Sequence, residues 1–299
     1  MFFQNLFENL ALQLLFCVGI ISVLGLVIWQ LNRALFKILG WKKGRRIFLS
    51  TGYMGVPVHE FGHAFFCVIF LHKIVEVKWF QPNSKDGTLG YVRHKYNKKN
   101  FYHQIGNFFI SIGPLLFGSL AIIILMFLLV PNSGIVAHAS KVRLSGESGF
   151  LPIITDYGNV LGKVFLAVFD YHNLINFPWW IFIVAACSIA MHMDLSWADI
   201  KGMIRGLIYI VVIMLVLNAI LVLVYVKASR AITRGCLWLS VSVVSFMALA
   251  VLLLGMLVLT CLIIKTINGR VKKRLGISGG KPVTGASTTA PAVAERRGM

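Results

Sequence analysis

The sequence is poor in charged residues, and above all in acidic ones. Only 13% of its 299 residues are charged, and just 10 are Asp or Glu. An ordinary globular protein carries about 25% charged residues, so this composition argues against a soluble core. Instead, 58% of the residues are hydrophobic, and several apolar runs reach the length that crosses a bilayer. The sequence therefore predicts a polytopic helical membrane protein.

Cysteines are also scarce. All five fall within predicted spans or at their edges, and none has the spacing of a metal-binding motif; they are Cys17, Cys67, Cys187, Cys236 and Cys261. We interpret them as small buried apolar residues that say little about the redox compartment. The first nine residues lack a basic start, and no small-residue cleavage site follows the first apolar run, so we expect no cleavable signal peptide.

The net charge of +19 arises from 29 basic residues against 10 acidic ones. Nucleic-acid binding is the usual first interpretation of such a balance. Here the basic residues lie mainly in short connections and in the C-terminal tail, where they can contact anionic lipid headgroups and set orientation. We therefore expect the lipid bilayer, and no nucleic acid, as a partner of these charges.

The apolar runs predict an all-α polytopic membrane protein with about six transmembrane helices and a small β-hairpin between the second and third spans. The hairpin is expected from two β-branched and aromatic stretches, 74–80 and 88–94, on either side of a turn-rich segment. A helix in the membrane interface is expected within 131–176, because apolar residues recur there at helical spacing. The expected spans cover approximately 10–31, 47–71, 101–130, 177–193, 204–226 and 237–264.

This pattern divides the chain into four parts. Residues 1–46 form an N-terminal transmembrane helix and a basic connection, and 47–202 form the core that carries the polar motifs. Residues 203–267 supply two C-terminal transmembrane helices. The tail, 268–299, is basic and rich in Gly, Ser, Thr, Pro and Ala, a composition that cannot bury a core and that predicts disorder.

One polar motif, His59-Glu60-Phe61-Gly62-His63, lies inside the second apolar run. Residues four apart on a helix lie about 40° apart around its axis, so His59 and His63 can aim two imidazoles at one point. Two such histidines hold zinc in the zincin arrangement, and the glutamate takes a proton from the metal-bound water. The alternative is a polar cluster satisfied by neighbouring helices. A charge in the hydrocarbon costs on the order of 2.5 kcal/mol or more, which favours a functional site.

A second cluster of polar residues lies at the end of the short fourth span. His192, Asp194 and Asp199 follow one another there, and Gly202 comes shortly after. Asp199 has a purely structural alternative: with Ser196 it can form a capping box at the start of the next helix, a role worth about 1 kcal/mol.

Four features of the chain resemble those of the site-2 protease family of intramembrane metalloproteases. They are a membrane-embedded H-E-x-x-H, a hairpin, a helix with Gly113-Pro114 and a short span that ends in an acid. The resemblance covers about 47–202. It implies that zinc is held by His59, His63 and a distant aspartate, that Glu60 is the general base, and that the hairpin helps to present an unwound transmembrane substrate. It makes Asp199 the expected third ligand, with Asp194 as the alternative.

The chain departs from that family in the stretch before the third ligand. Asp199 is separated from Gly202 by two residues, and the asparagine that would polarise the scissile carbonyl is missing. His192 can replace it, since it would share a face with Asp199 on a continuous helix. A polar residue at the membrane boundary is the other interpretation of His192.

The expected function is hydrolysis of peptide bonds in transmembrane protein substrates by zinc-activated water, in an integral, multi-pass protein of the cell membrane. Two other classes of function are also consistent with the sequence. A membrane metal transporter could use the same histidines and acids, although it would spread ionisable groups along a path. A catalytically inactive relative could only bind transmembrane partners, although an intact Glu60 argues against that function.

Overall fold

The computed structural model describes residues 2–84, 87–131, 133–134 and 150–274. The chain divides into two compact units, Met1–Cys261 and Leu262–Met299. Of the second unit, only the last turns of one helix lie within the described residues. All the contacts discussed below belong to the first unit.

The chain begins with three helical stretches that follow one another directly, namely α1 (Phe2–Leu14), the π-helical turn η1 (Leu15–Gly19) and α2 (Ile20–Leu39). Gly40 ends them with a positive φ of 75°, a conformation that glycine adopts without the steric penalty of a Cβ. Its N–H donates to the carbonyl oxygen of Phe36 at 2.9 Å. The chain can thus turn at once into α3 (Trp41–Ile69), which carries the H-E-x-x-H motif.

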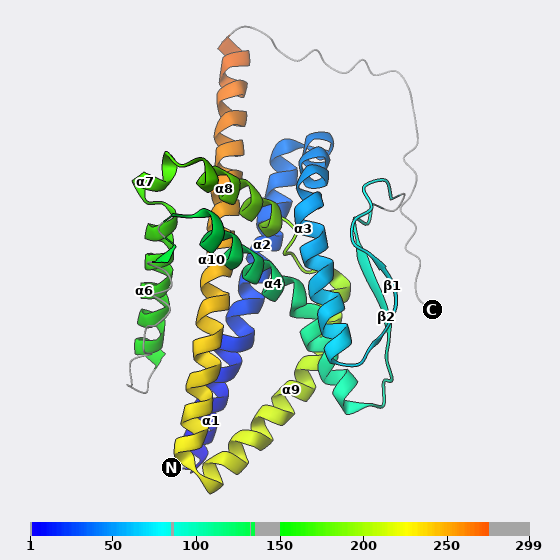
Figure 1. Cartoon of the computed structure of the whole chain (residues 1–299), viewed down its shortest axis with the longest axis vertical. Coiled ribbons are helices and arrows are strands. Elements are labelled where there is room, and N and C mark those ends of the chain that lie inside the picture. Colours follow the sequence, from blue (N-terminus) through cyan, green and yellow to red (C-terminus); the bar gives the residue numbers. More distant parts are fainter. Residues whose placement is uncertain (1, 85–86, 132, 135–149, 275–299) are drawn as a thin grey trace. The chain divides into compact units, whose positions relative to one another are not determined.

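The remaining elements follow in the order shown in Figure 1. The strands β1 (Lys73–Lys78) and β2 (Tyr91–Lys95) come first, and helix α4 (Phe101–Leu129) follows them. The later helices are α6 (Phe150–Val168), α7 (Tyr171–Leu174), α8 (Phe177–Ala190), α9 (Trp197–Val224) and α10 (Val226–Arg274). Over the described ranges the fold is therefore mainly helical with one small two-stranded sheet, as the sequence predicts.

Among the described residues, four helical segments are long and apolar enough to cross a membrane: Phe2–Leu39, Phe101–Leu129, Trp197–Val224 and Val226–Val271. Helix α3 has the length of a span, but it starts with a basic cluster and carries the polar motif, and it is not among the four. Helix α8 is apolar but has only 14 residues, fewer than the ~20 that a straight span needs. The helices are those of a membrane protein.

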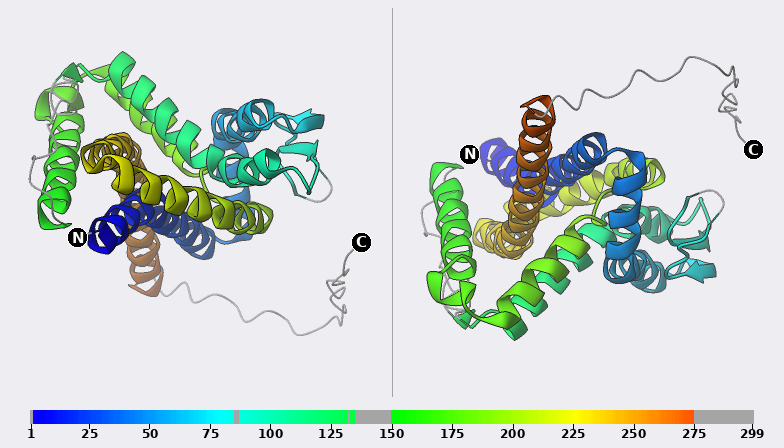
Figure 2. Two further views of the ribbon diagram at one scale, coloured as in Figure 1. Left: turned by 90° about the horizontal axis from the view of Figure 1, so that it is seen from below. Right: turned by 90° about the horizontal axis from the view of Figure 1, so that it is seen from above.

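The predicted hairpin is present. β1 and β2 pair antiparallel, with Lys73 opposite Lys95 and Lys78 opposite Tyr91, and the register shifts by a bulge between Ile74 and Glu76. The hairpin lies against α3, as Figures 1 and 2 both show. Part of its expected turn, residues 85–86, lies outside the described residues.

Helix α4 is the element that brings the site together, because it contacts α3, α8 and α9. It approaches α3 through two glycines: a Cβ built on Gly62 would lie 2.5 Å from the carbonyl carbon of Gly113. Small residues of this kind let two membrane helices approach closely. Pro57 and Pro114 lie inside α3 and α4, and neither ends its helix.

A buried polar network, which the sequence does not predict, joins α1 to α9 and α10. Gln13 of α1 donates to Thr233 of α10 at 2.9 Å and accepts from Asn218 of α9 at 2.8 Å. Asn9 donates to Ser229 at 2.8 Å. Side-chain hydrogen bonds between helices of this kind stabilise membrane bundles by about 0.6 kcal/mol each.

Two further expectations can be compared with the structure. The helix expected within 131–176 is α6, and Val160, Val164 and Val168 on it are buried; its place in the membrane interface stays a prediction. Helix α10 continues to Arg274, into the segment 268–299 that was predicted as a disordered tail. Lysine and arginine are good helix formers, and they dominate these last turns. Residues 275–299 lie outside the described part of the chain.

Candidate metal centre and its cavity

His59 and His63 lie one turn apart on α3, and their Nε2 atoms are 3.1 Å from each other. Both imidazoles are anchored on their other nitrogen. The Nδ1–H of His59 donates to the carbonyl oxygen of His192 at 2.6 Å, and that of His63 donates to the carbonyl oxygen of Ile110 at 2.7 Å. Because a carbonyl oxygen can only accept, each Nδ1 carries the proton and each Nε2 presents a lone pair.

Two lone pairs that face each other at 3.1 Å repel, unless a cation lies between them. In a tetrahedral zinc site two ligand nitrogens are about 3.3 Å apart, given Zn–N bonds of about 2.0–2.1 Å. Anchoring of the distal ring nitrogen by a carbonyl is also what metal-binding histidines ordinarily show. The donor set and its orientation therefore fit a divalent metal ion.

Asp199 brings a carboxylate to the same point from α9. Its Oδ1 lies 3.5 Å from Nε2 of His63. The three potential ligand atoms of His59, His63 and Asp199 all lie within 4.8 Å of one another. Two elements far apart in the sequence thus supply two nitrogens and one oxygen, a donor set that zinc accepts.

Asp199 also forms the capping box that was its structural alternative. Ser196 is the N-cap of α9, and its backbone N–H and side-chain hydroxyl donate to Asp199 Oδ2 at 2.8 and 2.6 Å. The backbone N–H of Asp199 donates in return to Ser196 Oγ at 3.2 Å. The two interpretations of Asp199 do not exclude each other, because one carboxylate oxygen completes the cap and the other faces the histidines.

These side chains line one cavity of about 550 Å³ that also reaches the hairpin. Glu60 lies in its wall and is buried, with 5% of its surface exposed. Gly90, in the segment that leads into β2, passes directly over this carboxylate: a Cβ built on Gly90 would lie 2.9 Å from Glu60 Oε1. The hairpin therefore forms one wall of the space in front of Glu60.

The other cavity walls are mixed in character. From the hairpin come Thr88 and His94, and from the start of α9 come Lys201 and Arg205. Burial, followed by the neighbouring charge of His72, lowers the pKa of His94 to about 4, so this ring is neutral at pH 7. The cavity thus offers hydrogen-bonding groups and two cations within one volume.

His192 lies in the loop between α8 and α9 and not on a helix with Asp199. The prediction of a continuous helix from His192 to Asp199 is wrong, because α8 ends at Ala190 and α9 begins only at Trp197. The His192 imidazole lies 3.1 Å from Thr51 Oγ1 and packs on the ring of Phe48. What His192 brings to the site is its backbone carbonyl, which anchors His59.

Asp194, the alternative ligand, lies in the loop between α8 and α9. It interacts electrostatically with His59, and its side chain forms a hydrogen bond with the side chain of Asn32 of α2. Within the described residues, however, the groups of ligand atoms close enough to share an ion include Asp199 and not Asp194.

Sequence reasoning missed the two carbonyl anchors, Ile110 and His192, because a backbone oxygen leaves no mark in a sequence. It also missed Gly90, whose only signal is a glycine just before a predicted strand, a position that can indicate close backbone approach. No family model, no curated protein and no solved structure matches this chain. The resemblance to site-2 proteases therefore rests on the sequence motifs alone.

Proposed function

We propose that the protein is an intramembrane zinc metalloprotease that hydrolyses peptide bonds within the transmembrane segments of protein substrates. The observation that carries this proposal is the orientation of His59 and His63, whose protonated nitrogens are anchored on carbonyls while their lone pairs face each other at 3.1 Å. Asp199 Oδ1, close to the same point, supplies the third ligand.

In the proposed reaction, the zinc ion and the side chains of the protein contribute different steps. A bound zinc ion would lower the pKa of its water towards about 7 and polarise the scissile carbonyl. Glu60 would act as the general base, taking a proton from the attacking water and giving it to the leaving amine. Glu60 is buried, which strengthens electrostatic interactions at its carboxylate.

In this proposal the substrate peptide enters between the hairpin and α9, where the cavity lies. A peptide bond in a helix is shielded by its own turn, so the substrate must unwind locally, and the edge of a two-stranded sheet offers backbone groups to an extended segment. Lys201 and Arg205 are suited to interact with carbonyl oxygens of that segment, because both carry hydrogen-bond donors.

The proposed topology has about six spans in a multi-pass protein of the cell membrane. In the part of the chain that the structure describes, four helical segments have the length and composition of spans. Helix α3 and the short helix α8 complete the six, since their contacts with α4 would shield the polar side chains from lipid. The lipid bilayer is then the partner of the apolar outer faces, and nucleic acid has no part in the function.

The test compares the parent chain with Glu60→Gln, which removes the base but leaves both histidines. Purified proteins would be assayed for zinc by mass spectrometry and for cleavage of a transmembrane reporter in proteoliposomes. We expect the zinc content to be unchanged and cleavage to fall by about 10²–10⁴-fold. Glu8→Gln, an exposed acid on α1, is the matched control and should cleave as the parent does.

Full cleavage by Glu60→Gln would overturn the proposal. A metal transporter would bind zinc and carry it across the proteoliposome membrane without cleaving any reporter. An inactive binder would retain a reporter without cleaving it and without moving metal. The same preparations therefore separate the three classes.

A further inference from the structure

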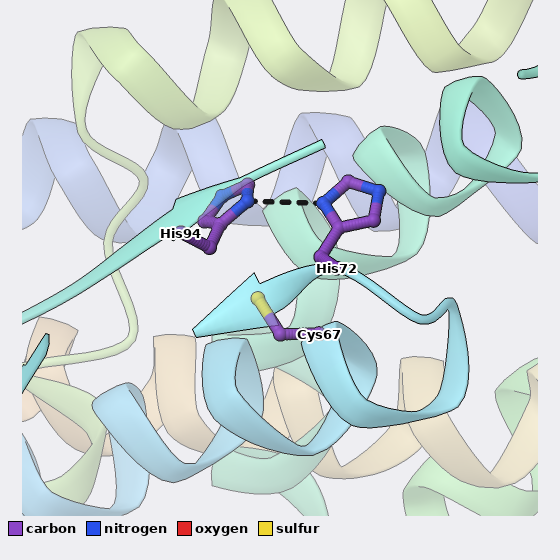
Figure 3. A group of neighbouring side chains, drawn as sticks. All are labelled: Cys67, His72 and His94. Atoms are coloured by element: carbon purple, nitrogen blue, oxygen red, sulfur yellow. Dashed lines mark hydrogen bonds between the residues drawn. The ribbon is translucent and has the colours of Figure 1, made fainter. Parts of the chain in front are cut away.

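A second group of metal-binding side chains lies where the hairpin joins α3. Cys67 is in the last turns of α3, His72 follows in the connection to β1, and His94 is on β2 (Figure 3). The three potential ligand atoms all lie within 4.8 Å of one another. This group shares no residue with the His59, His63 and Asp199 centre.

The surroundings of these three side chains favour the binding of a metal ion. Cys67 is fully buried and His72 has 4% of its surface exposed. The Nε2–H of His72 donates to the carbonyl oxygen of His103 at 2.9 Å, which leaves the lone pair on Nδ1. That Nδ1 lies 3.0 Å from Nδ1 of His94, and a carbonyl on the distal nitrogen is the usual support of a metal-binding imidazole.

The backbone is bent so as to bring His72 back towards Cys67. Leu71 has a φ of 56°, and it is the only residue other than glycine with a positive φ in the part of the chain described by the structure. The N–H of His72 donates to the carbonyl oxygen of Cys67 at 2.8 Å across this turn. A side chain other than glycine is strained in this region, and strain of this kind gathers at functional sites. The ring of Tyr96 stacks on His72 and fixes its orientation.

We infer that Cys67, His72 and His94 form a second metal site, which takes zinc or a similar thiophilic divalent cation. One thiolate and two imidazoles are ligands that zinc prefers, and they disfavour the oxygen-seeking cations calcium and magnesium. The site would join the end of α3 to β2. Since His94 also lines the cavity in front of Glu60, the ion would hold that wall of the cavity in place.

Cobalt offers a readout specific to this site, because the proposed catalytic centre contains no sulfur ligand. The full-length protein would be stripped with a chelator, reloaded with Co²⁺, and examined for the thiolate-to-cobalt charge-transfer absorption in the near ultraviolet. We expect this band in the parent chain and its loss in Cys67→Ser. The control Cys187→Ser, a cysteine of α8 outside the group, should keep the band.

Zinc stoichiometry then assigns the two sites. We expect two equivalents in the parent, one in Cys67→Ser, one in His94→Gln, and one in the His59→Ala/His63→Ala double variant, which should still show the cobalt band. A parent chain without the band would overturn the inference whether or not any variant folds. Retention of two zinc equivalents by both Cys67→Ser and His94→Gln would overturn it as well. Neither result decides whether the first site cleaves peptide bonds, which the comparison of the parent with Glu60→Gln tests.

Discussion

His63 and Asp199 meet at the centre of the site, with 3.5 Å between Nε2 of the histidine and Oδ1 of the aspartate. The other carboxylate oxygen, Oδ2, accepts two hydrogen bonds from Ser196. The start of α9 thus fixes the direction in which Asp199 presents Oδ1. The positive end of the α9 dipole also favours a negative charge at this position.

Asp199→Asn should lose the metal of the first site. The amide is a poorer zinc ligand than the carboxylate, whereas the Ser196 hydroxyl still accepts from the backbone N–H at position 199 and preserves the helix start. Zinc analysis of the purified variant measures the loss. Asp194→Asn, a change of the same kind in the preceding loop, is the control and should keep the metal; metal lost only in Asp194→Asn would show that Asp194 is the ligand.

Ser196→Ala tests the support of Asp199 without changing any ligand. Removal of an N-cap hydroxyl costs about 1 kcal/mol of stability, and loss of a partner that orients a ligand typically weakens metal binding about 10- to 100-fold. We expect both effects, the first in thermal unfolding and the second in competition with a zinc chelator. An affinity equal to that of the parent would mean that the cap and the metal site are independent.

The sequence predicts much of this fold because its signals are local. Apolar runs of membrane length, a turn-rich segment between β-branched stretches, and histidines four residues apart each define an element without knowledge of the rest of the chain. The H-E-x-x-H motif on α3 and the Ser196 cap of α9 are of this kind.

What the sequence does not predict depends on contacts between distant segments. The carbonyl anchors of His59 and His63 come from α4 and from the loop before α9. Cys67 has no motif spacing to a second cysteine, and only the return of β2 brings His94 to it. The continuous helix from His192 to Asp199 is absent, because α8 ends at Ala190 and α9 begins at Trp197, and an apolar pattern does not reveal the turns between them.

Gly62→Ala should loosen the contact between α3 and α4. The added Cβ would meet the backbone of Gly113 at 2.5 Å, and a backbone cannot move aside as the end of a side chain can. Overpacking of this kind costs about 1–3 kcal/mol, so we expect a lower unfolding temperature together with weaker zinc binding, since α4 anchors His63. Gly158→Ala, on α6 with open space around its Cβ, should unfold no earlier than the parent. Equal stability of both variants would contradict the close approach of the two helices.

Gly90→Ala tests the position of the general base without replacing any metal ligand. A Cβ at this position would lie 2.6 Å from Cγ1 of Val56 and 2.9 Å from Oε1 of Glu60, so the carboxylate must shift. The three atoms nearest to that Cβ belong to Val56 and Glu60 and to none of the metal ligands. A displacement of about 1 Å of a catalytic group can cost on the order of 10²-fold in rate. We therefore expect the zinc content of the parent and a lower kcat for the transmembrane reporter, with Gly158→Ala again as the control. Cleavage at the parent rate would mean that Glu60 works without the close approach of the hairpin, and the base would then have to act from a position other than the one seen beneath Gly90.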